Sequence, residues 1–381
     1  MRCKNVIIVF VVFWITLNYI EAMNCINNQL INYYINKIRI DKPKIKDILD
    51  IKVERQLEIG DSNSENFAFY GKIFLTIDEK ENVIISNNRT VKKYNKYGNY
   101  MFKIGKIGQG PGEYENPSNI FTDINNNIYV KDFYEFVCYS ENGEYIKNIY
   151  LNNIGNEAAI LSDVILMERS YIREKDEIDD VITFNVRESD SKNIAEYKKI
   201  KRYIKGRQVR LFGETYDNFI FISRTNSGEG IVGLADKYEI IILNGKGDPI
   251  NIIEKKEKPI KIEKSEKNEL INKNYEIFKK GPFKITKNEI GDLLALPKNK
   301  PYFKKIYYDN NKLFIEKYES KERKSKIYDV ISLNGEYLFI LRLNITPVLI
   351  KNQNIYTIEK DISSDYEKIV KYKMIFKSGQ D

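Results

Sequence analysis

The stretch that decides the fold is Gly-Lys-Ile-Gly-Gln-Gly-Pro-Gly-Glu-Tyr-Glu-Asn-Pro, residues 105–117. It lies between two copies of one pattern, because a shift of 45 residues takes Asp78 to Asp123 without a gap. The other identical pairs at this shift are Asn82 and Asn127, Tyr94 and Tyr139, Gly98 and Gly143, Tyr100 and Tyr145, and Ile104 and Ile149. A period of this length indicates a repeat architecture, with propeller blades among the leading candidates.

Each copy reads as four short antiparallel strands. In the second copy, two apolar runs flank the polar turn 125–127, which predicts two strands joined by a tight turn. A third strand at 137–139 is followed by Glu141-Asn142-Gly143-Glu144 and by a fourth strand at 145–151. Asn-Gly favours such turns because both residues tolerate positive φ. Four strands in about 45 residues, with no helix, predict one blade.

The glycine-rich stretch therefore carries the chain from the outer strand of one blade to the inner strand of the next. Gly108, Gly110 and Gly112 supply backbone freedom, while Pro111 and Pro117 fix φ and remove amide donors that would have no partner. A Gly-rich phosphate cradle is the alternative, but it requires a helix immediately afterwards. A strand follows here, which favours the structural role.

The run Gly-Gln-Gly-Pro-Gly-Glu-Tyr, then Pro, a strand and Asp-x-x-x-Asn-Ile-Tyr-Val-x-Asp, resembles the six-bladed β-propellers common among exported Bacteroidetes proteins. That family is similar in shape to NHL-type propellers. The resemblance is strongest over 70–150, recognisable over 299–378 and weak over 155–300. It implies a fold and an exported location, but no catalytic residue.

The remaining chain fits an all-β, six-bladed propeller of four-stranded antiparallel blades spanning 51–378. Residues 159–167 and 181–186 are candidate strands of the third unit, with a charged turn at 173–180 between them. The fourth unit spans about 209–253 and the fifth begins near 306. In the fifth, Asn-Gly-Glu-Tyr at 334–337 repeats the tetrad at 142–145.

Two segments outside the regular units have predicted roles. The strand at 52–59 is expected to close the ring by pairing with the last blade near 369–376, because closure removes a free sheet edge. Residues 256–298 break the β pattern and predict a helical insertion capped by Ser265 and ended by Gly281-Pro282. Its face of Ile271, Tyr275 and Phe278 could belong to a lid over the disc or to an excursion packed on the rim.

The N-terminal residues 1–22 have the form of a secretory signal peptide, with an uncleaved anchor as the alternative. Residues 23–50 form a lead-in, in which 27–40 is an amphipathic helix or a frayed segment. Cys25 is a candidate for lipid modification, although Ala22-Met23-Asn24 departs from the usual preceding box. Cys138 is expected to be a buried small hydrophobe. Two cysteines in a mature chain make neither a disulfide framework nor a zinc site.

The composition limits the function. The net charge of +8 comes from dispersed charges, which favours a solvated surface over a nucleic-acid or membrane patch. The densest basic stretch is an alternative site for an anionic glycan or lipopolysaccharide, and it comprises Lys201, Arg202, Lys205, Arg207 and Arg210. The chain contains no histidine, which excludes Ser-His-Asp and Cys-His catalysis and imidazole metal sites.

The candidate site residues are few. Asp78, Asp123 and Asp309 recur after the first strand of a unit, where they could bind calcium but more simply bond to their own turns. Glu113 could face the central channel or brace the backbone. No catalytic, cofactor or metal residue is assigned.

We therefore expect a monomeric binding or scaffold module in the periplasm or at the cell surface, for a glycan, peptide or protein partner. A histidine-independent lyase or hydrolase acting on sugars is the alternative. Polar side chains converging at the channel mouth would favour that enzyme, and a channel plugged by apolar residues would favour the scaffold.

Overall fold

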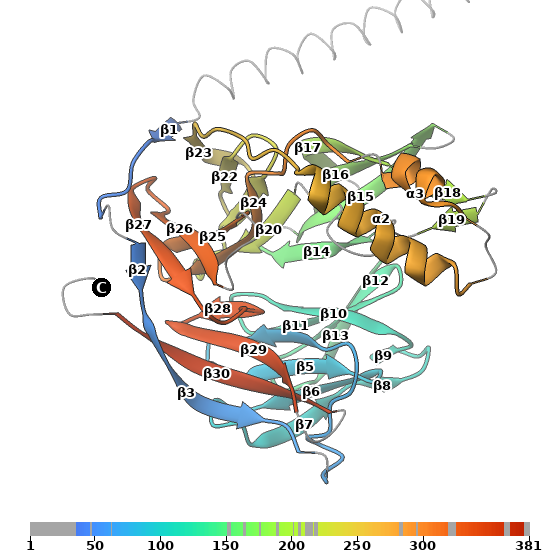
Figure 1. Ribbon diagram of the computed structural model, residues 1–381. Coiled ribbons are helices and arrows are strands. Elements are labelled where there is room, and N and C mark those ends of the chain that lie inside the picture. Colours follow the sequence, from blue (N-terminus) through green and yellow to red (C-terminus); the bar gives the residue numbers. More distant parts are fainter. Residues whose placement is uncertain are drawn as a thin grey trace, which may run out of the picture.

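The computed structural model describes most of the chain, with two helices and many short strands (Figure 1). The described residues are 36–45, 48–61, 63–150, 154–162, 165–174, 177–187, 190–200, 202–204, 207–209, 216, 220–281, 285–294, 296–318, 325–361 and 366–376. The predicted signal peptide, Cys25 and the start of the lead-in lie outside them. Lys201, Lys205 and Arg210 of the basic stretch also lie outside.

The described strands include six sheets of four or five strands, each one blade of a propeller. Their bounds are β4 (Phe74–Ile77), β5 (Val83–Asn87), β6 (Thr90–Tyr94) and β7 (Tyr100–Ile104) in blade 1; β10 (Pro117–Thr122), β11 (Ile128–Asp132), β12 (Glu135–Tyr139) and β13 (Tyr145–Tyr150) in blade 2; β14 (Ile154–Ile160), β15 (Ile165–Glu174), β16 (Glu177–Arg187) and β17 (Asp190–Ile200) in blade 3; β20 (Ile220–Arg224), β21 (Gly230–Leu234), β22 (Glu239–Leu243) and β23 (Pro249–Lys255) in blade 4; β24 (Phe303–Asp309), β25 (Lys312–Lys317), β26 (Lys326–Ser332) and β27 (Tyr337–Leu343) in blade 5; β28 (Leu349–Lys351), β29 (Asn354–Lys360), β30 (Glu367–Ile375) and β3 (Lys52–Ile59) in blade 6. The predicted fold class is confirmed.

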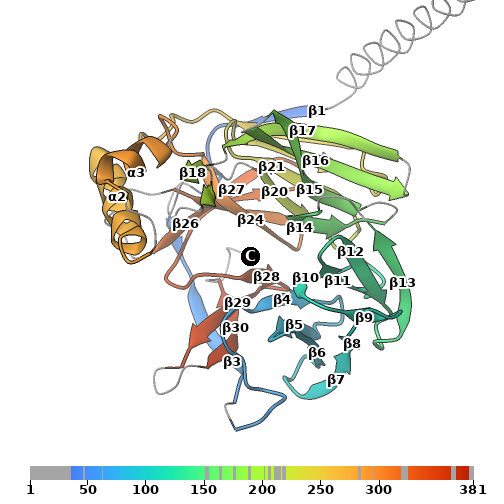
Figure 2. The ribbon, with the colours of Figure 1, turned by 90° about the vertical axis from the view of Figure 1, so that its right-hand side faces the viewer.

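The blades form a closed ring (Figure 2). Their inner strands contact one another in the order β4, β10, β14, β20, β24, β28 and again β4. The ring is closed by β3, which pairs antiparallel with β30 from Lys52 opposite Ile375 to Ile59 opposite Ile369. The predicted closure is confirmed, and it gives the C-terminal blade its fourth strand from the N-terminal part of the chain.

Apolar residues on the middle strands hold neighbouring blades together. Every residue of β5 is buried, because a middle strand packs against blades on both sides. Ile84 and Val91 of blade 1 share one apolar cluster with Ile120 and Val130 of blade 2. Such runs read as continuous hydrophobic stretches, while the outer strand β13 is largely exposed.

The disc has two faces of different construction. We call the turn face the one that carries the turns following the first and third strand of each blade, such as 78–82 and 95–99 in blade 1. We call the linker face the one that carries the connections between blades, such as 105–116. The two-residue strands β8 (Lys106–Ile107) and β9 (Glu113–Tyr114) pair in parallel within that connection.

The N-terminal lead-in runs along the outer edges of the last three blades. β1 (Asn36–Ile40) pairs in parallel with β23 of blade 4, and β2 (Ile48–Asp50) pairs in parallel with β27 of blade 5. The chain then continues into β3 on blade 6, and all three segments lie on one side of Figure 1. The interpretation of 27–40 as a helix or frayed lead-in is wrong for residues 36–40, which form a strand; residues 27–35 lie outside the described part.

The repeated turn glycines provide room for the neighbouring blade. A Cβ on Gly143 would lie 2.8 Å from the ring of Phe102 on β7, and one on Gly98 would lie 2.9 Å from Leu57 on β3. A Cβ on Gly335 would lie 2.4 Å from Ile38 on β1. All three glycines have positive φ, near +80°. Glycine therefore serves both the turn conformation and the close packing of an outer strand against the next blade.

The helical insertion is confirmed as α2 (Lys264–Phe278) and α3 (Lys287–Leu294). The expected cap at Ser265 is wrong: Glu263 is the N-cap, in a capping box with Glu266. The helix ends at Phe278, with Lys279 as its C-cap, three residues before Pro282.

The face of Ile271, Tyr275 and Phe278 packs on an apolar cluster that includes Tyr216 and Tyr318. In Figure 2 both helices lie outside the ring of blades and do not cross its centre, so the insertion is an excursion at the rim.

The third unit departs from its predicted boundaries. Residues 159–167 contain the end of β14 and the start of β15, so they do not form one strand. The predicted turn at 173–180 is too long, because β15 continues to Glu174 and β16 begins at Glu177. The strand predicted at 181–186 lies within β16. Charged residues in these long strands do not form a turn, because register with neighbouring strands decides their conformation.

The linker glycines have the structural role that the sequence favours, and the structure adds a steric reason for Gly105. Gly105 has φ of +60°, and a Cβ there would lie 2.3 Å from the hydroxyl of Tyr139. Tyr114 follows in the linker and is fully buried; its hydroxyl donates to the Ile104 carbonyl at 2.8 Å and accepts from the Val91 amide at 3.1 Å. The linker is therefore a packed connection between blades.

We predict that Gly105→Ala destabilises the fold far more than Gly71→Ala. Both glycines have left-handed φ, +60° and +69°, which costs an alanine about 1–2 kcal/mol. Only Gly105 also faces Tyr139, and overpacking adds about 1–3 kcal/mol, whereas nothing lies within 4 Å of a Cβ at Gly71. Urea denaturation of both variants measures the difference. Equal losses would contradict the steric role of Gly105.

Candidate functional site: two repeat-related grooves on the linker face

Two of the three recurring aspartates of the turn face bond to their own turns. Asp78 accepts from the amides of Lys80 and Asn82, and Asp123 accepts from the amides of Asn125 and Asn127. At both positions these bonds confirm the expectation that the aspartate bonds to the backbone of its own turn.

The third recurring aspartate has a different partner. Asp309 accepts from the amides of Asn352 and Gln353, which belong to the turn of the next blade. Burial raises the pKa of the Asp309 carboxyl, against the lowering effect of the two amides. Among the described residues, no cluster of three or more Cys, Asp or Glu side chains could hold a metal ion.

The central channel holds a cavity of about 300 Å³, lined by the inner strands of all six blades. At its turn-face end, Glu79 accepts from Arg224 at 2.8 Å and from Lys351 at 3.0 Å. Arg224 also donates to the carbonyls of Thr122, Asp123 and Thr225. Polar groups therefore do converge here, but these charges bind one another and tie four blades together.

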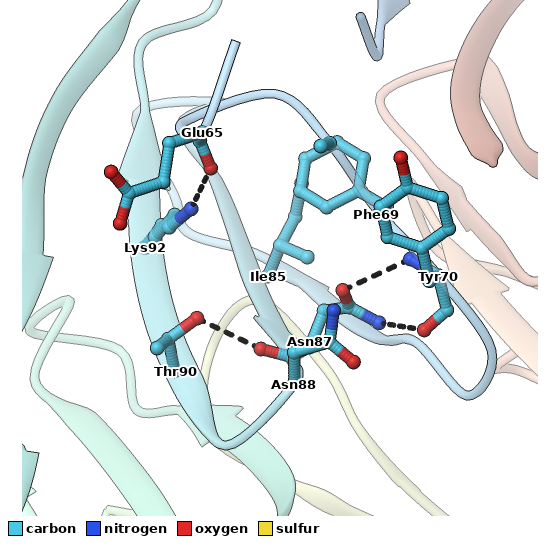
Figure 3. A pocket seen from close by; sticks show the side chains of 9 residues that line it. Glu65, Phe69, Tyr70, Ile85, Asn87, Asn88, Thr90 and Lys92 are labelled. Carbon is cyan, nitrogen blue, oxygen red and sulfur yellow. Dashed lines mark hydrogen bonds between the residues drawn. The ribbon is translucent and has the colours of Figure 1, made fainter. Parts of the chain in front are cut away.

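Two further cavities lie on the linker face at the same position of adjacent blades. The first, groove 1, has a volume of about 320 Å³ and is lined by residues 65–70 and 85–92 of blade 1 (Figure 3). The second, groove 2, has a volume of about 460 Å³ and is lined by residues 108–115, 132–135 and part of β13. The repeat shift of 45 residues takes Ala68 to Glu113, Tyr70 to Glu115 and Asn87 to Asp132.

The same arrangement in the two repeats builds both grooves. In groove 1 the Asn87 side chain binds the backbone of the incoming segment, accepting from the Tyr70 amide and donating to the Tyr70 and Lys72 carbonyls. In groove 2 the Asp132 carboxylate accepts from the amides of Glu115 and Asn116, both at 2.7 Å. The end of the second strand thus ties the incoming segment to the blade, beside the hollow.

Groove 1 uses its polar groups internally. Lys92 donates its ammonium to the Glu65 carbonyl at 2.6 Å, and Thr90 donates to the Asn87 carbonyl at 2.8 Å (Figure 3). Burial lowers the pKa of Lys92 below its ordinary value. Phe69 lies at the back of the groove and is buried. Groove 1 therefore presents few unpaired polar groups.

Groove 2 is rimmed by exposed aromatic rings. Phe133 and Tyr134 form the turn between β11 and β12 and are 52% and 68% exposed. Tyr145 and Tyr150 of β13 lie on its other side and are 43% and 65% exposed. Exposed rings gathered around one hollow are a feature of binding surfaces, because they offer large contact area at small entropic cost.

The polar lining of groove 2 is acidic. Its charged residues are Glu113, Glu115, Asp132 and Glu135, with no lysine or arginine in the lining. Glu135 accepts from the Asn148 amide group at 2.9 Å, and the Asn148 Oδ1 atom has no hydrogen-bond partner. A buried acceptor without a partner is costly, so a donor from a ligand would stabilise it.

Glu113 braces the linker, and it also lines groove 2. Its carboxylate accepts from the Gly110 amide at 2.8 Å and pairs with Lys106 at 2.9 Å. The Gly110 amide, followed by Lys106, lowers the pKa of the Glu113 carboxyl. A Cβ on Gly108 would lie 2.0 Å from this carboxylate, so the glycine makes room for the brace. The bracing role expected for Glu113 is confirmed.

Sequence reasoning did not find groove 2. The signal was present in the repeat alignment, where the polar turn residues Asn88 and Arg89 of blade 1 correspond to Phe133 and Tyr134 in blade 2. Aromatic rings at a tight turn have no core to fill, so this exchange points to an exposed surface. Its acidic lining became visible only when the linker and β13 were brought together.

The fold and its grooves define the class of protein, a six-bladed β-propeller. Residues 69–222 match the profile of a protein family described as a 6-bladed beta-propeller. The similar solved structures include a Bacteroides fragilis protein named, provisionally, as exported; it has 15% sequence identity and a TM-score of 0.53, covering 90% of this chain and 100% of that chain. The resemblance to propellers of exported Bacteroidetes proteins is confirmed.

More distant structures are similar in outline only. Virginiamycin B lyase from Staphylococcus aureus has 14% identity and a TM-score of 0.36, covering 85% of this chain and 100% of that chain. A gluconolactonase from Xanthomonas campestris has 9% identity and a TM-score of 0.39, covering 80% of this chain and 88% of that chain. These similarities carry no information on activity.

No curated protein matches the sequence. No helix in the described part of the chain is long and apolar enough to cross a membrane.

Proposed function

We propose that the protein is an exported binding module, at the periplasm or cell surface, that holds a partner through a cationic side chain seated in groove 2. The observation that carries the proposal is an acidic hollow rimmed by aromatic rings on a chain whose net charge is +8. An anionic ligand would meet four carboxylates there, whereas a lysine or arginine side chain would meet acceptors and ring faces.

The chemistry of groove 2 suits a donor of hydrogen bonds. Its lining offers carboxylates and the unpaired Asn148 Oδ1, which are all acceptors. Lysine and arginine carry only donors, and their cations are attracted to the faces of tyrosine and phenylalanine rings. The surface rings then exclude water from the contact and strengthen the charge interactions.

The competing enzyme function has less support. The polar side chains at the mouth of the central channel are paired with one another, so no acid and base are left poised toward a substrate. The absence of histidine removes the commonest general base from the chain. A binding role needs neither.

We predict that Tyr134→Ala weakens binding of a lysine-containing peptide about 2- to 5-fold, because one exposed cation–ring contact contributes about 0.5–1 kcal/mol. Tyr97→Ala is the matched control: Tyr97 is 69% exposed, but it lies in a turn of the opposite face. Isothermal titration with the peptide and its lysine-acetylated form measures both effects. Equal affinity for the two peptides would overturn the assignment of groove 2 to a cation.

A further inference from the structure

We propose that the partner is an extended polypeptide that adds a fifth strand to blade 2, parallel to β13, with alternate basic side chains reaching groove 2. This inference rests on the proposed function, because it specifies how the cationic partner is held. The backbone of β13 would supply affinity through strand hydrogen bonds, and groove 2 would supply selectivity.

The molecule itself shows that outer edges of its blades accept such a strand. β1 adds in parallel to β23, the outer strand of blade 4, with a continuous register from Asn36 opposite Asn251 to Ile40 opposite Lys255. β2 does the same on β27 of blade 5. β13 holds the corresponding position in blade 2, and no strand among the described residues pairs with its outer edge.

The edge of β13 carries fewer charged residues than the free edge of blade 6. β3, the outer strand of blade 6, carries charged side chains in ion pairs, including Arg55 with Glu58 and Lys52 with Glu54. Charged residues of this kind discourage pairing with another chain. β13 has one charged residue, Lys147, and exposes three large side chains, Tyr145, Ile146 and Tyr150. An unpaired edge strand with exposed apolar side chains is a template for another strand.

Groove 2 lies along this edge, which supplies the charge complementarity. Asn148 and Tyr150 of β13 line the groove, and they share one face of the strand because side chains alternate. Residues of an added strand on that face would lie beside them, within reach of Glu135 and the unpaired Asn148 Oδ1. Alternate lysines or arginines would therefore meet the carboxylates, while the intervening residues would face away.

A glycan is the competing occupant, since aromatic rings and carboxylates also suit sugars. A glycan would use groove 2 but would leave the backbone donors and acceptors of β13 without partners. The polypeptide is favoured because it satisfies both the groove and the edge, and because this chain already covers two equivalent edges with its own strands.

The test uses the full mature chain and blocked hexapeptides in which lysine alternates with valine, tyrosine or serine. Each peptide is also made with N-methyl groups on all lysine amides or on all intervening amides. In a paired strand alternate residues point their amides toward the partner, so one methylated form should lose at least tenfold in affinity and the other should bind nearly unchanged. A nitroxide at the peptide N-terminus should broaden amide signals near Tyr145 more than those near Tyr150.

A pair of protein variants provides the matched control. Ile146→Lys places a positive charge on the edge of β13 and should weaken peptide binding at least tenfold. Met101→Lys makes the same change on β7 of blade 1, where the side chain is 44% exposed against 48% for Ile146, and should leave binding unchanged. Thermal melting of both variants confirms that they fold.

The outcomes separate the two proposals. If the peptides bind and depend on Tyr134 but both methylated forms bind equally, the strand addition is wrong and the cation site stands. If unmethylated peptides fail to bind while neutral oligosaccharides bind and protect Tyr134, both proposals are overturned. Broadening near Tyr150 in place of Tyr145 would overturn the parallel direction inferred from β1 and β2.

Discussion

A chain shortened to begin at Asp61 is expected to lose cooperative folding, because it lacks the strand that closes the ring. Without β3, the edge of β30 is open and blade 6 has three strands. The deletion also removes Ile59, which is 1% exposed in one cluster with Tyr94, Tyr356 and Ile369. Burying each such side chain contributes about 1.5–3 kcal/mol, against a total stability of about 5–15 kcal/mol for a typical domain.

A series of truncations isolates the contribution of β3. With a chain beginning at Asn36 as the reference, a start at Asp41 removes β1 and a start at Ile51 also removes β2. These are parallel additions to sheets that already have four strands, so each start should lower the melting temperature through loss of buried Ile40 or Leu49 but keep a cooperative transition. Only the start at Asp61 opens the ring, and circular dichroism should then show a broad, non-cooperative transition.

Point variants keep the test decisive if the shortest chain cannot be purified. Ile59→Ala should lower the free energy of unfolding by about 2–5 kcal/mol, as for other buried aliphatic truncations. Ile48→Ala on β2 is the control, because Ile48 is 37% exposed and surface changes usually stay within about 0.5 kcal/mol. A chain starting at Asp61 that melts like the reference would contradict the closure.

The ring could be predicted because both the repeat and the closing strand have recognisable local sequence patterns. The shift of 45 residues placed both copies of the blade, and the strand predicted at 52–59 has the observed bounds. β1 and β2 have no such pattern. They are three to five residues long, and only the edges of β23 and β27 decide that they are strands. Ile38 and Ile40 alternate as in a strand, but Ile38 also continues the helical spacing of Ile31, Tyr34 and Ile35.

The candidate site was less predictable than the fold. The expected turn and bracing roles of Asp78, Asp123 and Glu113 could be derived locally, because each bonds within a few residues of itself. Groove 2 combines the linker, the turn at Phe133 and the far side of β13, which meet only in the folded blade. The repeat aligned the residues, but exposure of the rings depends on the packing around them.

A buried ion cluster between blades 4 and 5 is the basis of the second prediction, a large loss of stability when its carboxylate is removed. The carboxylate of Asp329 is fully buried; it accepts from Lys255 at 2.6 Å and from the hydroxyls of Tyr238 and Tyr337, both at 2.5 Å. Lys317 lies 3.7 Å away. Burial by itself raises the pKa of the Asp329 carboxyl, but the two ammonium groups outweigh it and hold that pKa below its ordinary value. The cluster thus joins β23, β25 and β26 by charge.

Asp329→Ala is expected to cost about 3–5 kcal/mol of unfolding free energy at pH 7, because it leaves buried cations short of a counter-charge. Asp50→Ala is the control for an exposed pair: Asp50 lies 3.3 Å from Arg342 with 63% of its side chain exposed, and such pairs contribute about 0–1 kcal/mol. Urea denaturation of the two variants measures both costs. A loss at Asp329 no larger than that at Asp50 would contradict the structural role of the cluster.

The pH dependence and a double variant show that charge is responsible. Because the folded pKa of Asp329 is depressed, its stabilisation is present above the unfolded pKa of about 3.9 and is lost as pH falls through the folded value. The difference in unfolding free energy between the native chain and Asp329→Asn should therefore become smaller below about pH 4. Lys255→Met combined with Asp329→Ala should cost less than the sum of the single changes, since each alone unbalances a cluster in which Glu257 also pairs with Lys255 and Lys317. Strict additivity, or a difference that does not change with pH, would assign the loss to packing of Tyr238 and Tyr337 in place of the ion cluster.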